Sequence, residues 1–405
     1  MTMLSSRPMH TRPEQLVCIL QDLLPTYRVP LFEELARRLS ELEQTLAVVF
    51  PEPSPFGSNA STFRDLSWAF PVPYQRFGVS DIRLLRVDGM NRFKNARLLV
   101  LPEAVSNLSS LGLLAQRRIA SRGRPSLRTL VWGLGGDVLN RGLRRQLSDA
   151  VNRYRDRYTD LWMAYSRETE HAVQSRGMPK ERTRVVGNAM LGREEAALLR
   201  DLSAAAIPEV GGRIRVAFIG TMRPAKRIPF LIQALPKLKE SCRDLELCIV
   251  GDGPDLALIK AWAQSEPWVR TLGRQEGARK AEILARSDFL ISPGNAGLVA
   301  TEAQVAGVPV ITSASSLQTP EFNFLTDDLR VVVDDGGDPS IFGVRAGRWM
   351  VENLDRVRNI RPLLVAERAG SGHIDTVEDV ARRMVEALAE AERLPPRGDP
   401  RQAIA

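Results

Sequence analysis

The chain has few of the residues that build metal centres and disulfide frameworks. Its 405 residues include three cysteines and three histidines, which are scattered between His10 and His373. Neither set has the close spacing of metal ligands, so a histidine-based metal centre is not expected. A disulfide framework is not expected either, and scattered free thiols are typical of a reducing cytoplasm.

Long hydrophobic runs are also missing. No apolar stretch approaches the roughly 20 residues that cross a bilayer, and the first residues, MTMLSSRPMHTRP, lack the hydrophobic core of a signal peptide. We therefore expect a cytoplasmic protein that is neither secreted nor integral to a membrane. The content of 44% apolar and 26% charged residues is that of a globular protein, and the length predicts two domains.

The excess positive charge is confined to the N-terminal half. Residues 1–190 contain 28 Lys and Arg against 18 Asp and Glu, whereas the remainder contains 28 basic and 30 acidic residues. Arginines crowd into QRRIASRGRPSLR and RGLRRQLSDAVNRYRDRY. In the second segment, helical spacing predicts a buried stripe with the arginines on the remaining faces; the stripe consists of Leu143, Leu147, Val151, Tyr154 and Tyr158.

Two interpretations of these basic segments stay open. The first is an ordinary solvated helix surface in an arginine-rich chain. The second is a surface that meets anionic lipid headgroups or a phosphate-bearing substrate. Nucleic acid is not expected as a partner, because no helix-turn-helix, RNA-recognition signature or interleaving of aromatic and basic residues accompanies the charge.

Short apolar strands alternate with helical segments through most of the chain, which predicts parallel sheets with helices on both faces. The segment ending in Pro208, Gly211 and Gly212 breaks this alternation and indicates a linker. The fold class is therefore α/β, with two Rossmann-like doubly wound domains that face a central cleft. We expect a first domain at 1–190, a linker at 191–212, a second domain at 213–372, a C-terminal helix at 373–394 that packs back across the cleft, and a disordered tail at 395–405.

Three strand ends of the second domain carry residues suited to binding. GTMRPAKR, residues 220–227, sets Arg223 and Lys226 in the turn that opens a helix, where basic side chains beside free N–H groups bind anions. VGDGPD is a glycine turn. SPGNAGLVATEA places Glu302 just inside a helix. A carboxylate there can accept hydrogen bonds from a sugar diol, or it can be a structural glutamate in a salt bridge.

In their order and spacing, these segments resemble the C-terminal domain of the GT-B retaining glycosyltransferases of group 1, family four of the carbohydrate-enzyme classification. The resemblance is carried by FIGTMRPAKR, CIVGDGPD, TLGRQ and SPGNAGLVATEAQVAGVPVIT and covers residues 213–312. The first half is similar more loosely, through LLPTYRVPLFEELA, VWGLGG and DLWMAYSRETEHAVQSRGM, to the acceptor domain of polysaccharide-building members.

The resemblance implies roles for individual residues. Lys226 and Arg223 would hold the donor diphosphate and Glu302 the ribose, and these are the implied catalytic residues. The remaining donor-binding residues would be Gly220, Thr221, Leu272, Arg274, Asn295, Gly297 and Leu298. On the acceptor side, Tyr27 and Arg28 follow the first strand, either as acceptor contacts or as a capping loop packed on its neighbour.

Three positions depart from the family pattern. Gly294 stands where the family usually has a second glutamate, with Asn295 as a substitute. Thr221 replaces an arginine, and Leu134 replaces a histidine in the tryptophan-glycine motif. No side-chain base can be named, so the leaving phosphate would take the acceptor proton. The chain has no Asp-x-Asp motif, and neither a metal nor another cofactor is expected.

The sequence thus predicts a retaining glycosyltransferase that moves a sugar from a nucleotide-diphosphate sugar to a cell-surface polysaccharide or a lipid-linked glycan. It would work in the cytoplasm or on the inner face of the plasma membrane, held there through its basic half. Alternatives are a non-catalytic relative that binds a partner or glycan precursor, another GT-B chemistry such as sugar-nucleotide epimerisation, and a transferase acting on a soluble small molecule.

Overall fold

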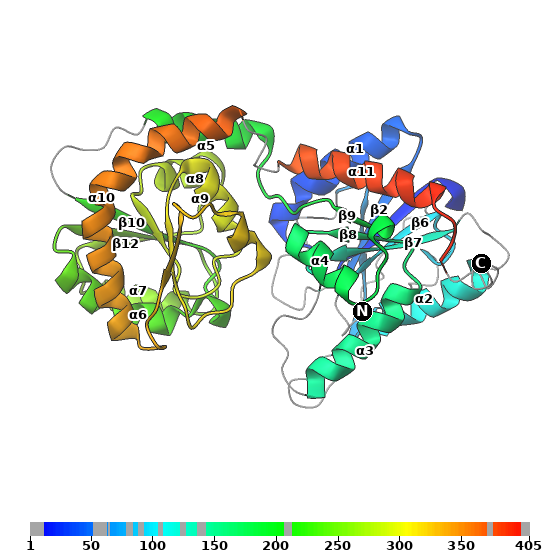
Figure 1. Cartoon of the computed structure of the whole chain (residues 1–405), viewed down its shortest axis with the longest axis horizontal. Coiled ribbons are helices and arrows are strands. Elements are labelled where there is room, and N and C mark those ends of the chain that lie inside the picture. The colour runs from blue at the N-terminus through cyan, green and yellow to red at the C-terminus, as the bar shows by residue number, and fades with distance from the viewer. Residues whose placement is uncertain are drawn as a thin grey trace. The chain divides into compact units, whose positions relative to one another are not determined.

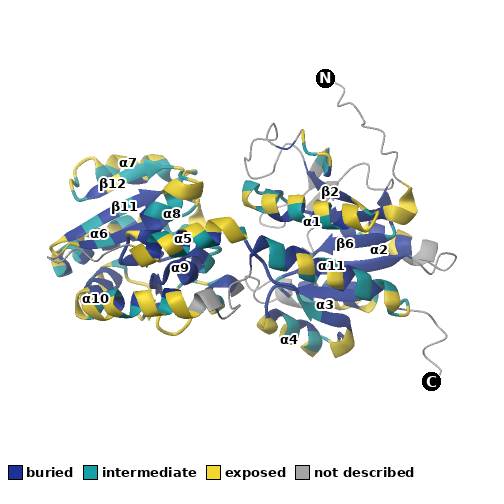
Figure 2. Ribbon diagram, turned by 90° about the horizontal axis from the view of Figure 1, so that it is seen from above, coloured by how far each residue is buried: buried dark blue, intermediate teal, exposed yellow. Residues whose placement is uncertain are grey.

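The computed structural model of the chain describes residues 12–51, 63, 65–77, 84–87, 93–103, 108–121, 127–135, 143–205, 213–370 and 376–397. By its internal contacts the chain divides into two compact units. The N-terminal unit consists of residues 1–188 and 377–405, and the C-terminal unit of residues 189–376. Figure 1 labels their elements, and Figure 2 shows that the strands inside each unit are largely buried.

The N-terminal unit is built on a parallel sheet in the order β3-β2-β1-β6-β7-β8-β9. The strands are β1 (Leu16–Leu20), β2 (Thr45–Pro51), β3 (Ala69–Val72), β6 (Leu98–Pro102), β7 (Arg128–Gly133), β8 (Leu161–Ala164) and β9 (Thr183–Val185), with a separate antiparallel pair, β4 (Tyr74–Phe77) and β5 (Leu84–Val87). β1 and β6 lie side by side although the chain leaves them toward opposite edges, so the switch point of the sheet lies between them.

Helices cover this sheet. They are α1 (Val29–Glu41), α2 (Leu108–Ser121), α3 (Leu143–Arg157), α4 (Arg167–Ser175) and α11 (Val377–Arg393), with short 3-10 turns η1 (Pro13–Gln15), η2 (Thr26–Arg28) and η5 (Lys180–Arg182). α11 packs against α1, β7 and β8 (Figure 1). It buries apolar side chains at helical spacing, namely Val377, Val380, Ala381, Met384, Ala387, Leu388 and Ala391.

The C-terminal unit has a parallel sheet in the order β12-β11-β10-β13-β14-β15. The strands are β10 (Ile214–Ile219), β11 (Leu245–Val250), β12 (Val269–Gly273), β13 (Phe289–Ile291), β14 (Val310–Ser313) and β15 (Arg330–Val333). Alternate residues of β10 face opposite layers, as the twofold repeat of a strand requires. Val216 and Phe218 contact one core, whereas Ala217 and Ile219 contact the other.

Each core of this sheet is closed by its own set of helices. α6 (Ile228–Ser241), α7 (Leu256–Ala263) and α10 (Pro339–Gly370) cover one face, and α5 (Arg193–Ala205), α8 (Gly277–Ala285), α9 (Val299–Ala306) and η7 (Pro320–Phe324) cover the other. α10 also reaches the second set, because the buried Arg361 donates to the carbonyls of Ala285 at 2.6 Å and Ala306 at 2.9 Å, at the C-terminal ends of α8 and α9. Positive charge there stabilises both helix ends.

The segment predicted as a linker is largely a helix. α5 lies within residues 191–212 and packs on α8, α9 and α10, so it is part of the C-terminal unit. Ala196 and Leu199 are buried on one side of it, and this apolar stripe explains why the segment folds onto the sheet. The predicted C-terminal helix, in turn, is α11, which belongs to the N-terminal unit.

The arginine helix α3 differs from the predicted amphipathic pattern. The prediction of a buried Tyr154 was wrong, because Tyr154 is 43% exposed whereas Arg155 is 3% exposed. The inward face of the described part of α3 is polar, with Ser148, Asn152 and Arg155 buried. The Arg155 guanidinium can be buried because the neighbouring Asp156 carboxylate lies 3.2 Å away and neutralises it.

Several further arginines of the basic half are structural. Arg117, Arg128 and Arg182 are each less than 9% exposed. They donate to main-chain carbonyls, Arg128 to those of Ala391 and Leu394 at the end of α11, both at 2.9 Å. The net charge of this half therefore overstates its basic surface. Within the described residues, no helix is long and apolar enough to span a bilayer.

Candidate donor site

Three loops of the C-terminal unit leave the carboxyl ends of β10, β11 and β13. In the sheet order, β10 and β13 are neighbours, yet the chain leaves them toward opposite edges. Open parallel sheets bind ligands at such a switch point, outside the carboxyl ends of the strands. Residues 220–227 follow β10 and residues 292–298 follow β13, so the sequence motifs lie at the place where the topology predicts a ligand.

Glycines allow these loops to pack directly on one another. A Cβ at Gly251, after β11, would lie 1.9 Å from the carbonyl oxygen of Gly220. A Cβ at Gly294, after β13, would lie 2.3 Å from the carbonyl oxygen of Ala225. Neither approach is available to another residue type. The absence of a glutamate at position 294 therefore has a local cause, because the backbone of the basic loop occupies the space of its side chain.

Lys226 joins the basic loop to the loop after β13. Its ammonium Nζ donates to the carbonyl oxygen of Ala296 at 2.6 Å, and its alkyl chain lies over Gly220. Burial of the ammonium, together with the nearby charge of the exposed Arg223, lowers the pKa of Lys226 to about 7. Lys226 thus lies at the switch point with an ammonium group that loses its proton more readily than an ordinary lysine. A bound anion would favour its protonated, charged form.

The loop after β13 is fixed by the side chain of Gln318. Gln318 Oε1 accepts from the Ala296 amide at 2.9 Å, while Nε2 donates to the Gly294 carbonyl at 3.0 Å and to Thr312 Oγ1 at 2.8 Å. The Asn295 amide donates to the Ala225 carbonyl at 2.9 Å, and its side-chain Oδ1 accepts from Thr319 at 3.2 Å. The Oδ1 atom of Asn295 therefore already has a partner in the segment that follows β14.

The loop leads into the N-terminus of α9. Gly297 has a φ of 64° and Leu298 occupies the N-cap position without a side-chain cap. The first amides of a helix lack intrahelical partners, and together with the helix dipole they favour an anion. Gly297 and Leu298 thus lie where the resemblance implies contact with phosphates or sugar.

Glu302 lies one turn into α9 and is only 2% exposed. Its Oε1 forms an ion pair of 2.6 Å with Nζ of Lys280 in α8, while Oε2 is buried without a partner among the described residues. Burial raises the pKa of Glu302, and Lys280 partly opposes this. Of the two predicted roles, the structure thus contains the salt bridge, and it leaves one carboxylate oxygen without a hydrogen bond.

The remaining predicted donor residues lie around this loop cluster. Thr221 and Arg223 are exposed beside Lys226. Leu272, at the end of β12, accepts from Gln275 at 2.8 Å through its carbonyl. Arg274 is exposed and pairs with Glu276 at 2.5 Å. Sequence reasoning missed Lys280 and Gln318, since neither falls in a motif and only the fold brings them to Glu302 and Gly294.

Tyr27 and Arg28 lie in the N-terminal unit, in η2 just past β1 at the switch point of that sheet. Arg28 donates to Tyr165 at 2.7 Å and to Gln21, and its guanidinium lies 4.8 Å from the centre of the Trp132 ring. Tyr27 is exposed. Arg28 thus makes the contacts of a loop packed on its neighbour, while Tyr27 faces solvent.

Comparison with known proteins matches part of the C-terminal unit to a family. Residues 213–338 match the family model for glycosyl transferases group 1. A phosphatidyl-myo-inositol mannosyltransferase of Mycobacterium leprae is 32% identical over 120 residues, which are 27% of this chain and 32% of that protein. The chain spans about a third of the length of the curated relatives it matches.

Solved structures resemble the whole chain in fold. Anabaena Alr3699/HepE in complex with UDP has a TM-score of 0.62 at 15% identity, covering 93% of this chain and 99% of that one. The UDP-GlcNAc 2-epimerase from Methanocaldococcus jannaschii has a TM-score of 0.53 at 11% identity, covering 92% and 99%. At these identities the likeness concerns the fold alone, and one fold can serve several functions.

By fold, the chain is a GT-B protein with two Rossmann-like parallel-sheet units, as the sequence predicted. In sequence, residues 213–338 of its C-terminal unit match the group 1 glycosyltransferases, which confirms the resemblance of that segment.

Proposed function

We propose that this chain is a glycosyltransferase that takes a sugar from a nucleotide-diphosphate donor bound by its C-terminal unit. The observation that carries the proposal is the position of Lys226, whose ammonium bridges the two loops at the switch point and has a pKa lowered to about 7. A dianionic diphosphate between Lys226, Arg223 and the N-terminus of α9 would restore that charge. These groups would stabilise the negative charge that develops on the leaving diphosphate.

Glu302 is proposed to bind the ribose through Oε2, the oxygen without a partner. Lys280 holds the other oxygen, so the carboxylate already has a fixed orientation. A diol that donates to Oε2 would satisfy a buried acceptor, and leaving such an acceptor unsatisfied costs about 1–3 kcal/mol. The ion pair and the ribose contact are therefore compatible roles for one side chain.

The finer features of the reaction are also proposals. We infer transfer with retention because the motifs of the C-terminal unit resemble those of the retaining group 1 glycosyltransferases. In that route the leaving phosphate takes the acceptor proton. Metal independence is inferred from the basic character of the diphosphate site. We propose a lipid-linked glycan or cell-surface polysaccharide as acceptor, since a matched relative is named for a lipid acceptor, and an inner-membrane location with it.

A second function is favoured by one observation. Because Gly294 has no room for a side chain, a contact that the family usually makes with the transferred sugar is absent. This favours a non-catalytic relative that retains nucleotide binding but has lost transfer. The two functions differ in turnover and share donor binding.

Thermal unfolding with a panel of nucleotide diphosphates and nucleotide sugars tests the shared step. A ligand at about 100 times its dissociation constant adds about 2.7 kcal/mol to the free energy of unfolding. We expect one nucleotide to stabilise the wild type, with and without EDTA, and to leave Lys226→Met unaffected. Lys237→Met, at an exposed lysine of α6, is the matched control and should respond as the wild type does. A panel without any stabilising nucleotide would contradict both functions.

A further inference from the structure

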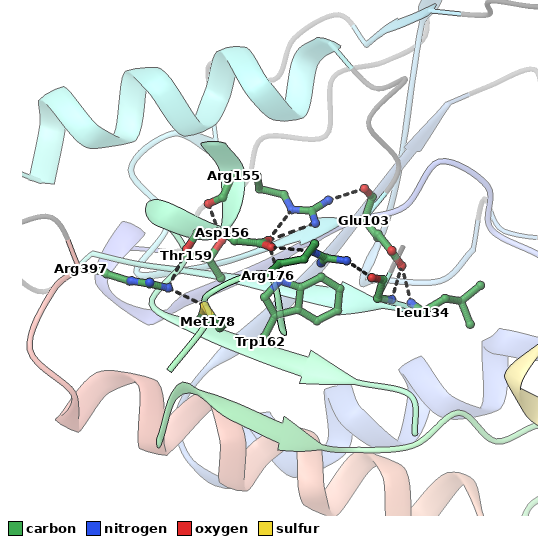
Figure 3. Close-up of polar contacts among 10 residues, drawn as sticks. Glu103, Leu134, Arg155, Asp156, Thr159, Trp162, Arg176, Met178 and Arg397 are labelled. Carbon is green, nitrogen blue, oxygen red and sulfur yellow. Dashed lines mark hydrogen bonds and ion pairs between the residues drawn. The ribbon is translucent and has the colours of Figure 1, made fainter. Parts of the chain in front are cut away.

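A buried polar cluster lies at the carboxyl edge of the sheet in the N-terminal unit. It joins Glu103, directly after β6, to the turn that follows β7 and to Arg155, Asp156 and Arg176 (Figure 3). β6 is one of the two strands at the switch point of this sheet. The cluster thus occupies, in the N-terminal unit, the position that the donor loops occupy in the other unit.

The Glu103 carboxylate is held on one side only. Oε2 accepts from the consecutive backbone amides of Leu134 and Gly135, the latter at 2.9 Å. Oε1 is buried and has no hydrogen-bond partner among the described residues. Burial raises the pKa of Glu103, although Arg155 and Arg176 oppose this. A buried carboxylate with one oxygen unsatisfied is costly, and few native positions retain one without a use.

The neighbouring arginines are committed elsewhere. Asp156 accepts from Arg155 at 3.2 Å, from Arg176 Nε at 3.1 Å and from the Trp162 indole at 2.9 Å. Arg155 also donates to the main-chain carbonyl of Glu103, and Arg176 to that of Gly135. These contacts fix the backbone on both sides of the Glu103 carboxylate, yet neither guanidinium pairs with it.

One donor in the cluster is also unsatisfied. Nη2 of Arg176 is buried without a partner among the described residues. The same guanidinium donates to the carbonyl oxygen of Gly135, and the amide of Gly135 donates to Glu103. The acceptor oxygen and the donor nitrogen therefore belong to two side chains that both contact the backbone of Gly135. A ligand with several hydroxyl groups, each able to donate and to accept, can satisfy both atoms.

We propose that Glu103 and Arg176 form a binding site for a polyhydroxylated ligand, a sugar or cyclic polyol. Oε1 of Glu103 accepts from a ligand hydroxyl, and Nη2 of Arg176 donates to a ligand oxygen. A metal ion fits less well, because the described residues contain no group of three or more potential ligands. The proposal rests on the glycosyltransferase function in one respect, since it assigns this ligand as the acceptor or its terminal sugar.

Saturation-transfer NMR with myo-inositol and methyl α-D-glucopyranoside tests the site without knowledge of the natural acceptor. We expect the wild type to transfer saturation to at least one of these polyols. Glu103→Gln should abolish the signal. The glutamine carbonyl can still accept from Leu134 and Gly135, so the turn is preserved, but an amide donor then replaces the free Oε1 acceptor.

Glu34→Gln is the matched control. Glu34 pairs with Arg37 and Arg38 on α1 of the same unit, away from the cluster, and its loss should leave the polyol signal unchanged. Should Glu103→Gln not fold, Glu103→Asp withdraws the carboxylate by one methylene and should lose the signal as well. A wild type without any polyol signal, or a signal that persists in the Glu103 variants, would overturn the proposal.

The same samples separate this proposal from the donor site. UDP and GDP added to them report nucleotide binding by the C-terminal unit through their own saturation transfer. If the wild type gives polyol signals but no nucleotide signals, the result counts against the proposed function and not against the polyol site. Loss of polyol signals from Glu103→Gln, with nucleotide signals retained, is the result expected if both are correct.

Discussion

The lowered pKa of Lys226 should make donor binding depend on pH. In the empty site the pKa is about 7, so about three quarters of the molecules carry the ammonium at pH 6.5 and about 3% at pH 8.5. A bound diphosphate favours the ammonium and moves its pKa back toward the ordinary value of Lys. Donor binding therefore takes up a proton above pH 7, and affinity falls as pH rises.

The expected magnitude follows from these fractions. Between pH 6.5 and 8.5 the dissociation constant should rise about 25-fold, which corresponds to about 1.9 kcal/mol. Isothermal titration with UDP-glucose or GDP-mannose, whichever binds, measures it. Nucleotide sugars suit this test better than free diphosphates, because they have no secondary phosphate ionisation in this range.

Lys226→Arg is the control, since a guanidinium stays charged across the whole range. Its dissociation constant should be nearly flat with pH, even if binding is weaker overall. Titrations above pH 7 in buffers of different ionisation enthalpy should also reveal uptake of up to one proton by the wild type. A flat wild-type profile, or an equal slope in Lys226→Arg, would refute the reasoning.

Two further predictions concern the loops and the ion pair of the C-terminal unit. Gly294→Glu restores the usual family residue, but its Cβ would lie 2.3 Å from the Ala225 carbonyl oxygen. We therefore expect the free energy of unfolding to fall by about 1–3 kcal/mol and nucleotide binding to be lost. Denaturant unfolding and nucleotide titration check this, and a gain of activity would contradict it. Lys280→Ala leaves Glu302 buried without its cation, at a cost of about 3–5 kcal/mol. Burial already raises the pKa of Glu302, so protonation at low pH relieves that cost. The loss of stability in Lys280→Ala should therefore be larger at pH 8 than at pH 5, and it should be largely absent in Lys280→Arg. Urea unfolding of both variants at the two pH values measures it.

The sequence predicted most of the fold because the buried strands are short, apolar and separated by glycine turns. β1 (Leu16–Leu20) is a short apolar run of this kind, and the order of strands and helices around β10 to β14 follows the motif order. α5 escaped prediction because its buried side consists mainly of small residues, such as Ala196. α10 had no clear amphipathic signal, since its contacts include guanidinium groups such as Arg361 as well as apolar side chains.

The candidate site was predictable only in part. Lys226 and Glu302 stand in recognisable motifs, and so does Ala296, whose carbonyl accepts from Lys226. Lys280 of α8, the partner of Glu302, lies in no motif. The count of charged residues also overstated the basic surface of the N-terminal unit, because Arg155 and Arg128 are buried inside it. A hydropathy scale assigns every arginine to the surface. Only the packed structure shows which arginines are buried and which carboxylate or helix end each of them contacts.

Release of the nucleotide from a sugar donor tests the central claim most directly. Purified protein would be incubated with UDP-glucose, UDP-GlcNAc or GDP-mannose and a phosphatidylinositol or glycan acceptor, beside Lys226→Met and Lys237→Met. The account predicts acceptor-dependent release of UDP or GDP with one donor, lost in Lys226→Met and retained in Lys237→Met. Donor binding without turnover, on every acceptor offered, would contradict the transferase and support the non-catalytic relative.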